Sequence, residues 1–147
     1  MALFDSTHTL DAVDAADQNA VFGTLAAKAV ELGVAADASA IVSDLHEREA
    51  EASTGFGNGV AVPHTKSANV STPAILFARL TAPVEWHALD DAPVDTVINI
   101  LVHDGGSDTH LQLLAKLARR LVHKDFVDHL KGDSIEDVCA LIQGVVG

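Results

Sequence analysis

Cysteine and long apolar runs are both scarce in this chain. Cys139 is the only cysteine among 147 residues, which excludes an internal disulfide. No segment approaches the roughly 18 consecutive apolar residues that a membrane-spanning helix requires. The first residues, MALFDSTHTLDAVD, show neither the basic start nor the apolar stretch of a signal peptide. The sequence therefore predicts a cytoplasmic protein.

Positive charge is scarce as well. The chain has 9 Lys and Arg residues against 21 Asp and Glu, a formal net charge of −12. Such a balance argues against binding DNA, RNA or an anionic membrane through a broad surface, so any phosphate contact must be local. The excess is mainly Asp and is scattered, which resembles the solvated surface of proteins from high-salt cytoplasm and suggests the hypothesis of a halophilic source.

The composition is that of an ordinary globular protein. Hydrophobic residues make up 48% of the chain and are spread along it, with no internal repeat and no low-complexity tract. A chain of this length can bury roughly 68–70% of its unfolded surface, so we expect residues 1–147 to form one domain. Cys139 falls on the apolar side of the helical pattern DVCALIQGVV, where we expect a buried packing residue.

Apolar residues recur at helical spacing in five segments. These are residues 18–32, 37–53, 108–123, 125–130 and 135–145. Asp17 and Asp37 are the expected N-caps of the first two helices, and Ser107 or Asp108 is that of the third. His110 then falls in the first turn of the third helix, where free backbone N–H groups and the helix dipole favour a bound anion.

Three further segments are typical of strands. They are the short run VAV at 60–62 and the longer runs PAILFARLTA at 73–82 and PVDTVINILVH at 93–103, both of which begin with proline. Trp86 lies between the two longer runs, and we expect it to pack at a hairpin corner rather than to bind sugar. Helices before, between and after strands predict an α/β sandwich.

The most informative segment is REAEASTGFGNGVAVPH, from Arg48 to His64. It ends a predicted helix and passes through a loop with glycine at alternate positions, where positive φ and close backbone approach are allowed. His64 follows a proline after the VAV run. Its ring is expected to emerge where a short strand ends and a turn begins, a position that presents a nucleophile to a partner.

The chemistry of His64 and Arg48 suits phosphoryl transfer. A neutral imidazole, with a reference pKa of about 6.5, can attack phosphorus without first losing a proton. A guanidinium can bind two phosphoryl oxygens at once. Simpler interpretations remain open from the residues alone: a Pro-His turn, an exposed Arg48 that pairs with Glu49 or Glu51, and a polar first-turn His110.

Three segments together resemble a known family. They are RE followed by STGFGNGVAVPH (Arg48 to His64), DAPVDTVINILVH (Asp91 to His103) and HLQLLAKLARRL (His110 to Leu121). In order and spacing they resemble the enzyme IIA domains of the fructose/mannitol class of the phosphoenolpyruvate-dependent sugar phosphotransferase system. The resemblance implies a mixed β-sheet covered by α-helices. It also implies a phosphotransferase component that takes phosphate from phospho-HPr and gives it to a cysteine of enzyme IIB. The membrane permease IIC would then be an indirect partner, reached only through enzyme IIB.

The resemblance also implies roles for particular residues. His64 matches the phosphorylated histidine, His110 the second active-site histidine and Arg48 the arginine beside the phosphate. The matching loop, which would bind phosphoryl or partner, consists of Thr54, Gly55, Phe56, Gly57 and Gly59. Phe56 stands where the family commonly has isoleucine, and it is the expected apolar contact to HPr and enzyme IIB.

Several functions stay open at this stage. The leading hypothesis is a carrier for fructose-type sugar uptake, without cofactor, metal or nucleic acid. The remaining histidines have no tight metal-ligand spacing, and GFGNG lacks the full spacing of a dinucleotide-binding motif. An alternative is a regulatory IIA protein, whose phosphorylated histidine controls binding to a transporter, kinase or transcription regulator. A third is a binding module without phosphotransfer.

Overall fold

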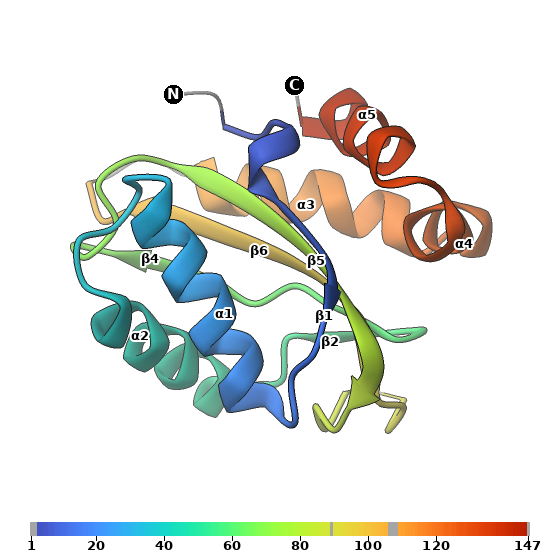
Figure 1. Ribbon diagram of the computed structural model, residues 1–147, viewed down its shortest axis with the longest axis horizontal. Helices are drawn as coiled ribbons and strands as arrows, with labels where there is room; N and C mark the ends of the chain where they lie inside the picture. The colour runs from blue at the N-terminus through green and yellow to red at the C-terminus, as the bar shows by residue number, and fades with distance from the viewer. Residues whose placement is uncertain (1–2, 89, 106–108, 147) are drawn as a thin grey trace.

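The computed structural model describes residues 3–88, 90–105 and 109–146, with the side chains of Thr109 and His110 outside that description. It shows a mixed sheet between two layers of helices (Figure 1), as the sequence predicts. The strands are β1 (Thr9–Val13), β2 (Gly55–Gly57), β3 (Val60–Ala61), β4 (His64–Ser67), β5 (Ala74–Val84) and β6 (Val94–His103). The helices are η1, a 3-10 turn (Ser6–His8), α1 (Gln18–Glu31), α2 (Ala38–Glu51), α3 (Thr109–Leu121), α4 (Lys124–Gly132) and α5 (Ile135–Val146).

Strand β6 organises the sheet. The strand order is β1-β5-β6-β3-β2, and β4 also pairs with β6. β5 and β6 are antiparallel, whereas β3 and β4 run parallel to β6 and β1 runs parallel to β5. The run VINILV in β6 is buried throughout, because helices cover both faces of the sheet at this strand.

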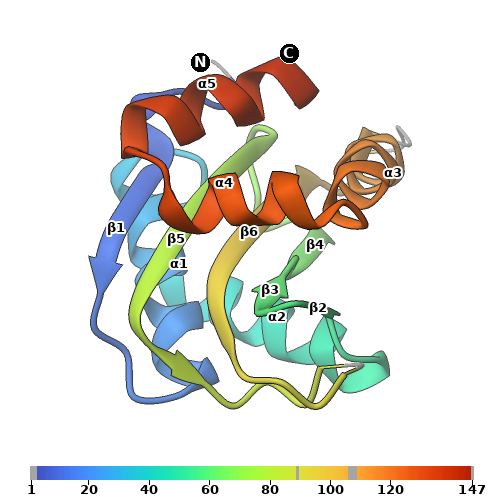
Figure 2. The same cartoon turned by 90° about the vertical axis from the view of Figure 1, so that its right-hand side faces the viewer.

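The two helical layers enclose two apolar clusters. Figure 2 shows α1 and α2 behind the sheet and α4 and α5 in front of it. Along β5 the side chains alternate between the clusters: Leu76 packs with the residues of α1 and α2, whereas Ile75 and Phe77 pack with those of α3, α4 and α5. Trp86 is buried against Phe22 of α1, with 5.5 Å between ring centroids, so its predicted packing role is confirmed.

Most of the predicted elements are present. Asp17 and Asp37 cap α1 and α2 as expected, by accepting from the N–H groups of Ala20 (2.8 Å) and Ser39 (3.0 Å). Cys139 is buried, as predicted. The cap expected at Ser107 or Asp108 lies outside the described residues. Among the described helices, none combines the length and hydropathy that crossing a membrane would require.

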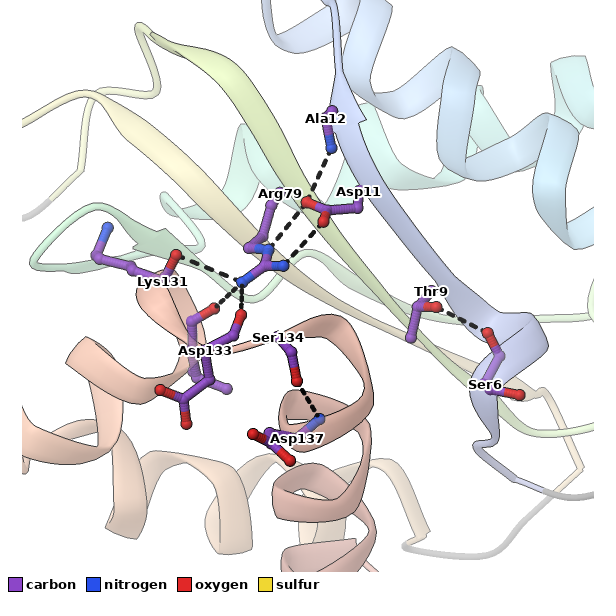
Figure 3. A network of polar contacts seen from close by, with 10 residues as sticks. Ser6, Thr9, Asp11, Ala12, Arg79, Lys131, Asp133, Ser134 and Asp137 are labelled. Atoms are coloured by element: carbon purple, nitrogen blue, oxygen red, sulfur yellow. Dashed lines mark hydrogen bonds and ion pairs between the residues drawn. The ribbon is translucent and has the colours of Figure 1, made fainter.

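A half-buried arginine joins three elements at the side of the sheet (Figure 3). Arg79 of β5 donates to both carboxylate oxygens of Asp11 in β1, at 3.0 and 2.9 Å. Its Nη1 donates to the carbonyls of Leu130 (3.3 Å), Lys131 (3.4 Å) and Asp133 (2.7 Å). These carbonyls are at the end of α4 and lack partners within the helix, so Arg79 caps α4 and ties it to the sheet.

This contact predicts a pH-dependent contribution to stability. Hydrogen bonds from Arg79 hold the pKa of Asp11 below its usual value. A lowered carboxyl pKa stabilises the folded state above the unfolded pKa of about 3.9, and that stability is lost as pH falls through the folded value. Asp11→Asn should lower the free energy of unfolding by about 0.5–1 kcal/mol at pH 7, a modest effect because the Asp11 side chain is 49% exposed.

Denaturant unfolding of the wild type and Asp11→Asn at pH 7, 5 and 3 measures this effect. The difference should be largest at pH 7 and should shrink towards pH 3, since a protonated Asp11 resembles asparagine. An unchanged difference over this range would show that charge at Asp11 does not contribute.

Candidate functional site

His64 lies at the start of a strand rather than at the end of one. It is the first residue of β4 and pairs with Ile100 of β6. The expectation that a turn begins here is wrong. Pro63 separates β3 from β4 because it has no N–H to donate, but its carbonyl still accepts from the Ile100 N–H at 3.0 Å, and β4 continues the pairing with β6. At 9% exposure the His64 residue is mostly buried, so the strand fixes the position of its ring.

The hydrogen bonds of His64 define which ring nitrogen can react. Nδ1 lies 2.8 Å from the carbonyl oxygen of Val62. A carbonyl oxygen only accepts, so Nδ1 carries a proton in this contact. In the neutral ring the lone pair is then on Nε2, which is therefore the nucleophilic atom.

Arg48 of α2 lies directly against that nitrogen. Its Nε donates to Nε2 of His64 at 3.2 Å, and its Nη1 donates to the carbonyl oxygen of Ala52 at 3.0 Å. The Ala52 contact holds the guanidinium at the end of α2. In the described structure Arg48 forms no ion pair with Glu49 or Glu51, so the interpretation as a surface ion pair is not supported.

A polar cleft of about 420 Å³ opens beside this pair, between α2 and β4. Its lining residues are Asp44, Glu47, Arg48, Glu51, His64, Thr65, Lys66, Ser67, Ala68 and Asp104. Four of these are carboxylates, whereas Arg48 and Lys66 are the cations. The Ser67 hydroxyl donates to Asp44 at 2.6 Å and links α2 to β4 across the cleft.

The backbone of His110 lies in the first turn of α3, as the sequence predicts. Its side chain is outside the described part of the structure. The structure therefore brings together His64 and Arg48, and the place of the His110 ring stays a prediction. Within residues 3–88, 90–105 and 109–146, no group of three or more His, Cys, Asp or Glu side chains is placed to hold a metal ion.

Thr54 connects the end of α2 to the strand that holds His64. Its N–H and hydroxyl donate to the two carboxylate oxygens of Glu49, at 2.6 and 2.5 Å. The Trp86 indole N–H donates to the same hydroxyl at 3.2 Å. The Thr54 carbonyl accepts from the N–H of Val62 at 2.9 Å, and Val62 in turn binds the Nδ1 proton of His64. Glu49 and Trp86 therefore position the site, which the sequence analysis did not anticipate.

Asn99 of β6 supports the segment that precedes His64, and the sequence analysis did not anticipate this role either. It is fully buried in β6, and its Nδ2 donates to the carbonyl oxygen of Pro63 at 3.0 Å. Its Oδ1 has no hydrogen-bond partner among the described residues. An amide in the middle of the apolar run VINILV is the sequence signal that marks this position, because a buried polar group requires a specific partner.

The glycine-rich segment forms a hairpin. β2 and β3 are joined by Asn58 and Gly59, with φ of 57° and 81°, the positive values of a primed hairpin turn. At Gly55 an added Cβ would lie 2.5 Å from the Cβ of Ala88, so no larger residue fits there without movement.

None of the described residues that line the cleft belongs to this hairpin. Thr54 is buried behind the hairpin, and Phe56 is half-buried against the cluster under α3, α4 and α5. A role in phosphoryl or partner binding stays a prediction for Thr54, Gly55, Phe56, Gly57 and Gly59.

The Thr54 network predicts that Glu49→Gln lowers both stability and activity. A glutamine oxygen can accept from the Thr54 N–H, but its NH₂ group then faces the Thr54 hydroxyl, which has to turn its own proton elsewhere. The expected loss is about 1–2 kcal/mol in the free energy of unfolding. Displacement of Thr54 and Val62 should slow phosphoryl transfer by a factor of about 10.

Thermal unfolding and the rate of His64 phosphorylation measure both effects. Glu136→Gln is the matched control, because Glu136 is an exposed residue of α5 and should change neither quantity. Wild-type rates in Glu49→Gln would show that the network does not position His64.

Comparison with known proteins identifies the family. Residues 2–145 match the family described as "Phosphoenolpyruvate-dependent sugar phosphotransferase system, EIIA 2". The chain is 39% identical over 116 residues to the "PTS system fructose-specific EIIA component" of Haloferax volcanii, covering 76% of this chain and 75% of that one. The protein therefore belongs to the EIIA type 2 family of the sugar phosphotransferase system.

Solved structures share the fold. The nitrogen regulatory protein IIA-Ntr from Neisseria meningitidis superimposes with a TM-score of 0.86 at 29% identity, covering 95% of this chain and 96% of that one. The IIA subunit in a complex of mannitol IIA and phosphorylated IIB from Escherichia coli gives 0.78 at 19% identity, covering 94% and 95% of the two chains. The second similarity concerns the fold alone.

Proposed function

We propose that this chain is a phosphocarrier that accepts a phosphoryl group on Nε2 of His64 and passes it to a cysteine of enzyme IIB. The observation that carries the proposal is the arrangement of the imidazole. The Val62 carbonyl holds the proton on Nδ1, and Arg48 lies against the Nε2 lone pair. Membership of the EIIA family supports phospho-HPr as the donor.

In the first transfer, Nε2 attacks the phosphorus of the donor phosphohistidine. The Nε2–P bond forms as the donor N–P bond breaks, and the donor ring leaves with the electron pair of that bond. His64 keeps its Nδ1 proton, so the Val62 carbonyl stabilises the positive charge that develops on the ring. No metal or nucleotide is required for the exchange between two nitrogen atoms.

Arg48 changes partner during this step. Its Nε–H leaves the lone pair of Nε2 and donates to a phosphoryl oxygen, while the Ala52 carbonyl keeps Nη1 in place. A phosphoryl group carries close to two negative charges. A unit ion pair at 4 Å is worth about 4 kcal/mol at an effective dielectric of 20, so the guanidinium can stabilise the transferring group substantially.

The surrounding carboxylates favour onward transfer. Asp44, Glu47, Glu51 and Asp104 line the same cleft and repel the bound phosphoryl group. Phosphohistidine is therefore held as a reactive intermediate. In the second transfer a partner thiolate attacks, the S–P bond forms and the Nε2–P bond breaks. The mannitol IIA that forms a complex with phosphorylated IIB has the same fold, which supports this kind of acceptor.

We assign the sugar as fructose-type, supported by the fructose-specific relative from Haloferax volcanii. In this proposal the protein works in the cytoplasm and acts on the permease IIC only through enzyme IIB. His110 donates a second hydrogen bond to the phosphoryl group, and Phe56 contacts both partners. The regulatory function is the second candidate, because the IIA-Ntr structure matches at the TM-score of 0.86.

Transfer to an acceptor separates the two candidates. The protein is phosphorylated with labelled phosphoenolpyruvate, enzyme I and HPr, and then mixed with the fructose-class enzyme IIB of the same source or its Cys→Ser variant. The proposal predicts that label moves to the wild-type IIB alone within seconds. Phosphorylated His64 that transfers nothing to any IIB would favour the regulatory protein, and no phosphorylation at all would contradict both.

A further inference from the structure

A cluster of basic residues lies along α3 and at the start of α4 in this otherwise acidic chain. Four of the nine Lys and Arg residues fall within residues 116–124, and residues 109–124 include no Asp or Glu. The like-charged pairs Lys116–Arg119 and Lys116–Arg120 are three and four positions apart on α3, where neighbouring side chains repel. This part of α3 therefore has a local field opposite in sign to the net charge of −12.

These cations border a groove between α3 and α5. The groove has a volume of about 430 Å³, and its charged lining residues are all cations, namely Lys116, Arg119 and Arg120. α5 contributes the rest of the lining, which is Ala140, Leu141, Gly144 and Val145. The groove is thus apolar along α5 and positively charged along α3, on the side of the sheet where the two helices lie together (Figure 1).

The groove continues towards α4. A second hollow of about 270 Å³ shares Arg120 and Leu141 with it and adds His123, Asp125, Phe126 and His129, so a carboxylate enters the lining only on the α4 side. The Arg120 guanidinium lies 5.1 Å from the centre of the Phe126 ring, which fixes one wall between the two hollows.

The cations of the groove have no carboxylate partner among the described residues. Elsewhere Arg79, Lys124 and Lys131 each form an ion pair with an aspartate. Lys116, Arg119 and Arg120 form none, although the chain has 21 Asp and Glu residues. No ion pair among the described residues therefore offsets their mutual repulsion, and a bound anion would relieve it.

We propose that the groove between α3 and α5 binds a small organic anion with an apolar body, such as a carboxylate or phosphate monoester attached to a hydrocarbon. The cations of α3 bind the anionic head, and the α5 side chains cover the apolar part. A volume of about 430 Å³ lies in the range of ligand sites, which is roughly 300–1,000 Å³. This inference is independent of the proposed phosphoryl transfer.

The charge of the whole chain favours a small ligand over a large one. A nucleic acid, an anionic bilayer or an acidic protein would face the many carboxylates outside the groove as well as its cations. A small anion remains within the groove. At physiological ionic strength screening acts over about 8 Å, so the adjacent cations dominate the field that it meets.

Titration of the ¹⁵N-labelled protein with octanoate tests the proposal, with octanamide as an uncharged probe of the same length. Octanoate should shift the backbone amide signals of residues 116–120 and 140–145. Octanamide should bind at least about tenfold more weakly, since it lacks the charge that the cations recognise.

Two kinds of variant test the two halves of the groove. Lys116→Gln with Arg119→Gln should weaken octanoate binding at least about tenfold, whereas Lys124→Gln, whose cation is paired with Asp128, should change it less than twofold. Gly144→Leu should block the groove and still fold, because nothing lies within 4 Å of a Cβ at Gly144. Gly23→Leu is the matched control on α1, where a Cβ also meets nothing within 4 Å.

Each contrary result overturns the proposal. Equal affinity for octanamide would show that charge has no part in binding. Shifts outside the groove, or octanoate binding unchanged in Gly144→Leu, would place the ligand elsewhere. A hexaglutamate peptide that shifts the groove signals when octanoate does not would identify the groove as a surface for acidic polypeptides.

Discussion

Replacing His64 by alanine is expected to abolish phosphorylation while leaving the fold intact. The imidazole is the nucleophile in this account, and among the described residues it is the only side chain to which the Arg48 guanidinium is seen to donate. Loss of a covalent nucleophile removes the reaction path itself, so transfer from phospho-HPr should fall by a factor of about 10⁴ or more. Label incorporation from phosphoenolpyruvate measures this directly.

The matched control is a histidine outside the cleft. His87→Asn should incorporate label as the wild type does, because the His87 side chain is 89% exposed and asparagine tolerates its positive φ of 56°. Circular dichroism should show that both variants are folded. Label retained in folded His64→Ala would place the phosphoryl group on another residue and refute the proposed carrier.

The second large effect is expected for Arg48→Lys. Lysine keeps the positive charge but cannot donate to Nε2 and to the Ala52 carbonyl from one rigid plane, as Arg48 does. Its ammonium group would bind the phosphoryl group as a single, less fixed donor. Transfer should slow by a factor of about 10–100. This is somewhat less than the rate decrease caused by removing a complete hydrogen-bond donor from a reactive oxyanion.

Rapid-quench measurement of the transfer from phospho-HPr tests this prediction. Arg119→Lys is a suitable control, because Arg119 is exposed on α3 and does not line the cleft. It should transfer at the wild-type rate. An Arg48→Lys variant as fast as the wild type would remove the guanidinium fork from the mechanism and leave only a role for its charge.

Local signals in the sequence were sufficient to predict most helices. The expected helix at 18–32 is α1 at Gln18–Glu31, because an aspartate cap and a repeating apolar face both act within a few residues. The same holds for the helices near the C-terminus. β5 and β6 were predicted because each is a long run of apolar and β-branched residues that begins near a proline. A short apolar run is harder to assign to a strand or a helix.

Short and polar strands could not be predicted in this way. β4 has the sequence HTKS and β2 has GFG, neither of which has strand composition. They are strands because β6 and β3 supply backbone partners. β1 similarly pairs with β5, about 70 positions further along the chain, a contact that no local pattern contains.

The same distinction applies to the site. His64 and Arg48 were predicted because their residue types suit phosphoryl chemistry and their segment resembles a family motif. The roles of Glu49 and Trp86 depend on Thr54, and the Trp86 contact joins residues 32 positions apart. Such contacts are defined only once β5, β6 and α2 are packed, so the sequence predicts that Trp86 is buried but not what it donates to.

The central claim is that Nε2 of His64 is the atom that carries the phosphoryl group. The most direct measurement is ¹H–¹⁵N long-range correlation NMR of the histidine rings before and after phosphorylation by phosphoenolpyruvate, enzyme I and HPr, under non-acidic conditions. The account predicts a proton on Nδ1 of His64 in the free protein and phosphorus on Nε2 in the product. Phosphorus on Nδ1, or on any other histidine, would contradict it.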